Sequence, residues 1–148
     1  MTRVDFYIIG STSADAAMDF SCRLAEKAWR SGHQILMHCA DAQQAAELDD
    51  RLWQFKPESF LPHELGAEGG ADIAICHAGD HTTMGDHCDL LINLAHDVPE
   101  PFSRFTRLAE IVDQREQSLA ASRQRYSFYK RRGYPLHNHN VGQKGGQQ

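Results

Sequence analysis

A cluster of histidine and cysteine residues between positions 76 and 88 gives the sequence its clearest potential for metal chemistry. Cys76-His77, His81 and His87-Cys88 place five thiol or imidazole groups within 13 residues, and both groups are good ligands for Zn²⁺. The spacing lacks the CxxC pair that is typical of zinc sites. Two interpretations therefore stay open, a zinc-binding regulatory protein and a surface loop rich in histidine.

Two glycine-containing stretches could in principle bind phosphate, but neither has the required pattern. The stretch 10–15 has no GxGxxG pattern and no P-loop lysine, and the stretch 66–72 would bring two carboxylates close to any phosphate. The serines Ser11, Ser13 and Ser59 do not lie in a GxSxG motif. The sequence thus predicts no nucleotide-binding loop and supports no catalytic mechanism.

The segment 52–63, with the sequence LWQFKPESFLPH, combines large apolar side chains with helix-breaking residues. Trp53, Phe55, Phe60 and Leu61 fall within nine residues, while prolines stand at positions 57 and 62. Proline interrupts a helix and cannot donate to a central sheet ladder. An irregular segment this rich in large apolar groups indicates either a partner surface or a cap folded over the core.

The length and composition bound the class of protein. A chain of 148 residues with 41% hydrophobic residues is long enough for one compact domain. It has neither an apolar run of the roughly 20 residues that a bilayer requires nor a signal-like start, so we expect a cytoplasmic location. The four cysteines are scattered, which favours reduced thiols, with Cys22 and Cys39 in the core.

The charge is unevenly distributed along the chain. Residues 1–113 contain 8 Lys or Arg and 19 Asp or Glu, whereas residues 114–134 contain 6 basic residues and one acidic residue. An acidic body repels the phosphate backbone, so broad DNA binding is not expected. The basic segment could instead bind an acidic peptide.

Hydrophobic patterns predict the elements that position these residues. Near-continuous apolar runs, as in 72–76 and 89–94, are typical of parallel strands covered on both faces. The residues around 102–112 favour a helical turn followed by a strand. The predicted fold is α/β, a single domain with a Rossmann-like, mostly parallel central sheet flanked by helices. The predicted strands are 3–9, 34–39, 72–76, 89–94 and 107–112, and the predicted helices are 13–31, 41–53 and 114–132. The predicted domain spans residues 1–134, and residues 135–148 are predicted to be a flexible tail.

With these elements in order, the sequence resembles the chi subunit family of bacterial DNA polymerase III holoenzyme over nearly its whole length. The resemblance rests on five stretches and their order: Phe6-Tyr7; Ala28 to Gly32; Leu52-Trp53 with Pro57 to His63; Asp89 to Leu94; and Arg123 to Tyr126 with Tyr129 and Gly133.

The resemblance implies a non-catalytic accessory subunit without a cofactor, in an assembly that has DNA-directed DNA polymerase activity. It implies that the protein bridges the clamp-loader complex, through the psi subunit, to the acidic C-terminal tail of single-stranded DNA-binding protein, and that it contacts DNA only indirectly and no membrane. The implied psi-binding residues are Trp53 and Phe60, with Leu61, Pro62 and His63 as neighbouring contacts. The implied tail-binding residues are Arg123 and Tyr126, with added charge from Arg125, Lys130 and Arg131. A zinc-binding regulator and a small-molecule enzyme on a Rossmann-like sheet are the alternatives.

Overall fold

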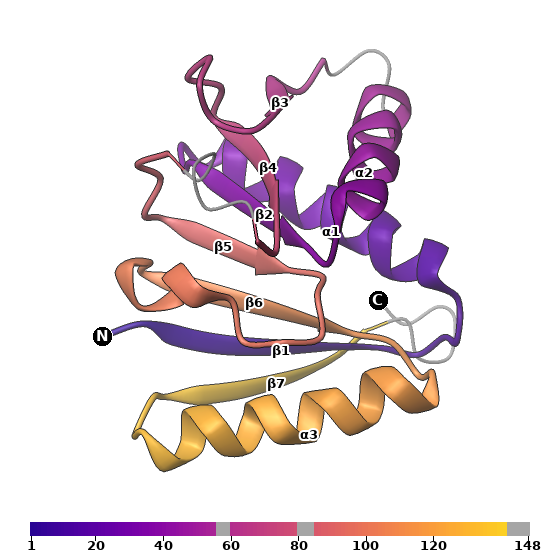
Figure 1. Cartoon of the computed structure of the whole chain (residues 1–148), viewed down its shortest axis with the longest axis vertical. Coiled ribbons are helices and arrows are strands. Elements are labelled where there is room, and N and C mark those ends of the chain that lie inside the picture. The colour runs from indigo at the N-terminus through magenta and orange to yellow at the C-terminus, as the bar shows by residue number, and fades with distance from the viewer. Residues whose placement is uncertain (56–59, 80–84, 142–148) are drawn as a thin grey trace.

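The computed structural model describes residues 1–55, 60–79 and 85–141. In this part of the chain a seven-stranded sheet, with every neighbouring pair parallel, has the order β3-β4-β2-β5-β6-β1-β7 (Figure 1). The strands are β1 (Arg3–Ile9), β2 (Ile35–Cys39), β3 (His63–Leu65), β4 (Ile73–His77), β5 (Leu90–Asn93), β6 (Arg107–Val112) and β7 (Leu136–Val141). The predicted α/β class with a parallel sheet is confirmed.

Helices cover both faces of this sheet. The α-helices are α1 (Ala14–Arg30), α2 (Ala42–Phe55) and α3 (Glu116–Arg131), and a short 3₁₀ helix, Glu100–Arg104, precedes β6. Buried residues of α1 and α2 share one apolar cluster with the sheet, and Tyr129 of α3 belongs to a second cluster. The sheet is therefore the middle layer of three, with α3 on the face opposite α1 and α2.

The ends of the helices follow from local chemistry. The Ser13 side chain accepts a hydrogen bond from the Asp15 amide at 3.1 Å and caps α1, and Gly32 ends that helix region with a φ of +92°. Asp41 caps α2 by accepting from the Gln44 amide at 2.8 Å. These caps stand at the first residues of the predicted helices 13–31 and 41–53, and α2 runs two residues beyond the predicted end at Trp53.

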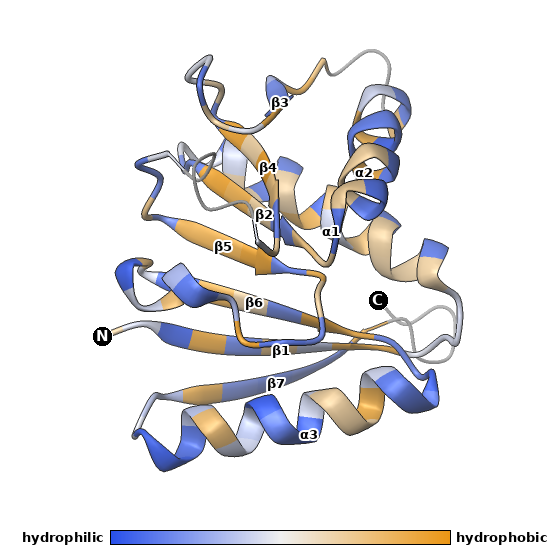
Figure 2. Cartoon of the chain, viewed as in Figure 1, coloured by the Kyte–Doolittle hydropathy of each residue, from blue (hydrophilic) through white to orange (hydrophobic). Residues whose placement is uncertain are grey.

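The central strands β2 and β5 are almost entirely apolar, with one polar residue each, His38 and Asn93. All residues of β2 and β5 are buried, and Figure 2 shows the middle of the sheet as predominantly hydrophobic. Each fully buried Ile or Leu contributes about 1.5–3 kcal/mol relative to exposure. This two-sided burial is the reason why the near-continuous apolar pattern identified these strands.

Strand β7 contradicts the prediction of a flexible tail from residue 135. Leu136–Val141 pairs in parallel with β1 along six residue pairs. The His139 imidazole approaches the buried Asp5 carboxylate at 2.9 Å and stacks on the Tyr7 ring with centroids 4.7 Å apart. The prediction is wrong for 136–141 because these contacts compensate for the polar composition, and residues 142–148 lie outside the described part.

Strand β3 was also not predicted. It has three residues, forms the other edge of the sheet, and begins after Pro62, whose carbonyl accepts the Ile73 amide at 3.2 Å. The helix break expected at Pro57 lies outside the described residues. A strand this short gives too few positions for a period of two to be recognised in the sequence.

Candidate partner-binding surfaces

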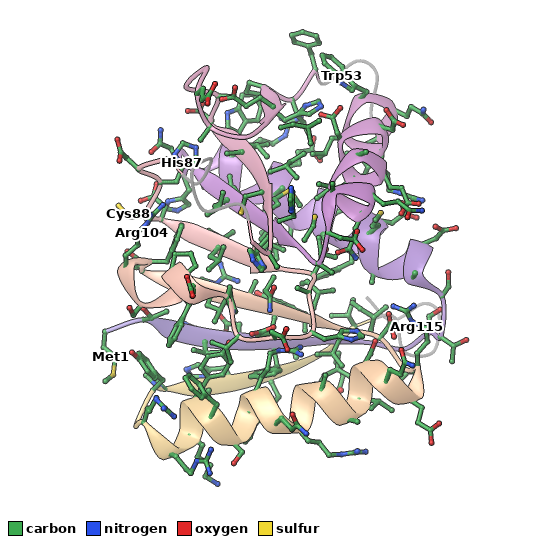
Figure 3. All side chains as sticks on the ribbon, viewed as in Figure 1. Met1, Trp53, His87, Cys88, Arg104 and Arg115 are labelled. Atoms are coloured by element: carbon green, nitrogen blue, oxygen red, sulfur yellow. The ribbon has the colours of Figure 1, made fainter. Side chains whose placement is uncertain are left out.

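Trp53 and Phe60, here called the aromatic patch, are exposed at the end of α2 and just before β3. The relative exposure is 53% for Trp53 and 71% for Phe60, and the centroids of the two rings are 6.0 Å apart. Figure 3 shows Trp53 projecting at the end of α2, away from the sheet. Aromatic side chains are the usual anchors of protein interfaces. The patch therefore has the composition and exposure of a docking surface.

The backbone of Phe60 supports this exposed position at an energetic cost. Its φ of +48° lies in the left-handed region, which costs a non-glycine residue about 1–2 kcal/mol. Leu61 follows it and is only 3% exposed. The chain thus turns so that one large side chain faces outward and the next enters the core.

The residues after Phe60 do not all share its exposure. Leu61 lies in the core cluster with α1 and α2, so the prediction that Leu61 contacts a partner is not supported by its position. Pro62 is partly exposed at the start of β3. The His63 side chain is 1% exposed and meets the Trp53 ring edge-on, with centroids 4.6 Å apart. The buried His63 ring therefore packs against the exposed Trp53 ring and supports it.

Beneath Trp53, His63 faces the carboxylate of Asp49. His63 Nδ1 lies 2.8 Å from the Leu61 carbonyl oxygen, which can only accept, so Nδ1 carries the hydrogen. His63 Nε2 is buried without a hydrogen-bond partner and lies 3.5 Å from Asp49 Oδ1. Burial raises the pKa of Asp49, and the His63 charge opposes that shift. The aromatic patch thus rests on a partly desolvated polar pair.

A groove of about 570 Å³, here called the cationic groove, runs beside α3 on the face of the sheet opposite α1 and α2. Arg123 and Arg131 line it from α3, and His96 and Asp97 line it from the segment after β5. Burial, followed by the charges of Arg125 and Arg115, lowers the pKa of His96. The positive charge of this cationic groove therefore comes from its arginines, which suits an acidic ligand.

Tyr126 lies one helical turn after Arg123, where side chains three positions apart are neighbours. The Tyr126 ring packs on Phe6 of β1 with centroids 5.3 Å apart and is partly exposed. It does not belong to the lining of the cationic groove. Arg123 and the exposed Lys130 are both solvent-accessible on α3, so the structure brings these three predicted residues onto one helix without joining them all in one pocket.

Arg125 differs from the other predicted tail-binding residues because it is buried. It is 3% exposed, donates from Nε to Glu110 Oε1 at 2.9 Å and from Nη1 to the His96 carbonyl at 2.6 Å. Glu110 also accepts from Tyr129 at 2.5 Å and from Asn93 at 2.8 Å. The prediction that Arg125 supplies steering charge is wrong in this respect: its charge is committed to a buried carboxylate.

The histidine and cysteine cluster is dispersed in space. Cys76 is buried, Cys88 is exposed, and His87 Nε2 bonds to the Ala71 carbonyl at 2.9 Å. His87, Cys88 and Arg104 lie side by side (Figure 3), where Arg104 donates to the His87 carbonyl at 3.0 Å. In the described ranges no group of three or more His, Cys, Asp or Glu side chains could hold a metal ion; His81 and Ser59 lie outside them.

The carboxyl ends of the strands, where parallel sheets usually bind small ligands, also form hollows. Two hollows of about 280 and 470 Å³ share His96 and Arg115 in their lining. Arg115 is held by Asp113, with Nη2 2.8 Å from Oδ2, and the smaller hollow is also lined by Asp41 and Glu47. This concentration of carboxylates disfavours a phosphate-bearing ligand.

These observations define the class of protein as an α/β domain on one parallel sheet, with an exposed aromatic patch and a cationic groove on opposite faces of the sheet. Within the part of the chain that is described, no helix has the length and apolar character needed to cross a membrane.

The chain belongs to the DNA polymerase III chi subunit family. The family model described as "DNA polymerase III chi subunit, HolC" matches residues 1–137. The chain is 46% identical over 142 residues to the DNA polymerase III subunit chi of Pseudomonas aeruginosa, which covers 95% of this chain and 98% of the relative. It is 34% identical over 140 residues to the Haemophilus influenzae subunit (93% and 96%) and 32% identical over 143 residues to the Escherichia coli subunit (92% and 96%). Family membership places the chain among the subunits of DNA polymerase III, an assembly of DNA replication.

Proposed function

We propose that this chain is a non-catalytic coupler within the DNA polymerase III assembly. In this role it binds the psi subunit of the clamp-loader complex through the aromatic patch. It binds the acidic C-terminal tail of single-stranded DNA-binding protein through α3. It reaches DNA only through that partner.

The observation that carries this proposal is the placement of two chemically different exposed surfaces on opposite faces of one sheet. The aromatic patch belongs to the end of α2 and β3, and the cationic groove belongs to α3 (Figure 1). Two partners bound there would be separated by the sheet and its helices. The arrangement therefore supports simultaneous binding of both.

For the tail, Arg123 is the side chain with the most suitable chemistry. It is exposed and lines the cationic groove, and a guanidinium can hold a carboxylate with two parallel hydrogen bonds. Tyr126 offers a partly exposed ring on the same helix for an apolar tail residue. Arg131 adds positive charge to the groove, which promotes association with an acidic peptide.

For psi, the aromatic patch supplies the binding energy. Trp53 and Phe60 are exposed in the unbound chain, so covering them removes a large apolar area from water. Truncation of either side chain to alanine should weaken binding by about 2 kcal/mol or more.

The test is calorimetric titration of the full chain with a peptide of the acidic C-terminal tail, at low and moderate salt. The wild type should bind, more weakly at higher salt because exposed charges are screened. Arg123→Ala should lower the affinity at least about tenfold, which corresponds to about 1.4 kcal/mol. Arg23→Ala is the matched control, because Arg23 is exposed on α1, on the other face of the sheet. Absence of binding by folded wild-type protein would refute the assignment of the tail site.

A further inference from the structure

The apolar surface around the aromatic patch extends further than Trp53 and Phe60. Among the described residues, the exposed large hydrophobic side chains are Met1, Trp53, Phe60 and Leu65, and Leu65 is 54% exposed. Leu65 lies two positions after His63 on β3, so both side chains point to the same face of the strand. Since His63 touches Trp53, Leu65 continues the patch along the edge strand.

Among the described residues, the carboxylate of Asp49 lies next to this apolar surface. Asp49 precedes Trp53 by one turn of α2, which places both on the same side of the helix. The Asp49 side chain is 21% exposed. The nearby arginine of α2, Arg51, is directed to α1, where it forms ion pairs with Asp15 and Asp19 at 2.8 Å. A partner that covers Trp53 would therefore bury Asp49 further.

Burial of a carboxylate is unfavourable unless a donor or an opposite charge compensates it. On one side, Asp49 Oδ1 faces His63 Nε2 at 3.5 Å, beyond ordinary hydrogen-bond length. The Asp49 side chain keeps 21% of its surface exposed, so a partner that covers Trp53 can still reach it. A basic side chain would satisfy Asp49 there, whereas an acidic side chain would be repelled.

We propose that Asp49 and Leu65 determine which segment docks on the aromatic patch, and that this segment is an amphipathic segment of psi. Its apolar side chains cover Trp53, Phe60 and Leu65, and a lysine or arginine among them pairs with Asp49. This inference rests on the proposed function, in which psi binds at this patch.

The experiment is titration of the full chain with the psi subunit from the same organism, at two salt concentrations. Asp49→Asn keeps the shape of the side chain and should lower the affinity at least about tenfold and reduce its salt dependence, because a partly buried charge pair is lost. Leu65→Ala should lower the affinity about fivefold or more through lost apolar contact. Asp50→Asn is the matched control and should change the affinity less than twofold, because Asp50 lines a different hollow, with Arg51 and Asp15.

The outcomes separate the two proposals. If the wild type binds psi and Trp53→Ala abolishes binding while Asp49→Asn and Leu65→Ala behave like Asp50→Asn, the specificity role is overturned and the psi site stands. If folded wild-type protein does not bind psi, both are overturned. The unfolding temperature of each variant is measured in parallel to show that it is folded. Asp49→Lys and Asp50→Lys give a second test of the charge pair, because only Asp49→Lys should repel the basic segment and weaken the binding of psi.

Discussion

Replacement of Arg125 by methionine tests whether this residue serves the fold rather than the cationic groove. Methionine can fill the space of the aliphatic stem but cannot donate. The variant therefore loses the Arg125 hydrogen bonds to Glu110 and to the His96 carbonyl. Glu110, which is 0% exposed, is left without its cationic partner.

The expected loss is about 3–5 kcal/mol of unfolding free energy, the usual cost of removing one partner of a buried ion pair. The two lost hydrogen bonds, at about 1.5–3 kcal/mol each when one group is charged, give a similar magnitude. The assay is urea unfolding followed by circular dichroism. Arg123→Ala, on the exposed side of the same helix, should change stability by only about 0.5 kcal/mol.

The pH dependence provides a second criterion. Burial raises the pKa of Glu110, and the Arg125 charge and the hydrogen bonds from Tyr129 and Asn93 oppose that shift. Without Arg125 the folded-state pKa should rise further. A raised carboxyl pKa favours the folded state below the unfolded pKa, and this advantage is lost as the pH rises. The deficit of Arg125→Met should therefore be larger at pH 7.5 than at pH 5. A loss below about 1 kcal/mol at pH 7.5 would refute a buried structural role.

Two further predictions concern the edge of the sheet formed by β1 and β7. Burial raises the pKa of Asp5, but hydrogen bonds from His139 and Arg107 outweigh it, so the net pKa is lowered. The stability that the ionised Asp5 contributes is fully present above the unfolded-state pKa of about 4 and is lost as the pH falls through the folded-state pKa. In urea unfolding at pH 3–7, Asp5→Asn should therefore lack this part of the pH dependence of the unfolding free energy. Removal of residues 136–148 should cost about 2 kcal/mol or more, because six parallel pairs with β1 are lost; an unchanged unfolding midpoint would instead agree with a flexible tail.

Elements buried on both faces could be predicted from sequence, and so could helices with a clear cap. The strand 34–39 is apolar except at Gln34 and His38, and Ser13 and Asp41 mark helix starts; these features correspond to β2, α1 and α2. Such signals are local, because each depends on a few neighbouring residues. For the segment 52–63 the residue pattern left a partner surface and a cap over the core both open; Trp53 and Phe60 are exposed, whereas Leu61 is buried in the core.

The features that sequence reasoning missed depend on distant partners. Residues 136–141 are polar, and their strand exists because β1 supplies hydrogen bonds and Asp5 supplies a partner for His139. Arg125 looked like its exposed neighbours in the basic helix, yet Glu110, 15 positions earlier, holds it in the interior. Spacing within α3 gave one usable signal: Arg125 lies four positions before the buried Tyr129 and so shares its face.

The left-handed backbone of Phe60 lowers the stability of the isolated chain, whereas its exposed ring serves the proposed binding of psi. Glycine at position 60 would relieve about 1–2 kcal/mol of strain but would delete the most exposed aromatic ring of the patch. A selection for thermal stability alone should therefore enrich Phe60→Gly while discarding psi binding. Consensus or stability-guided engineering of this protein would have to hold position 60 fixed, because the optimum for the isolated chain and the optimum for the proposed assembled state differ there.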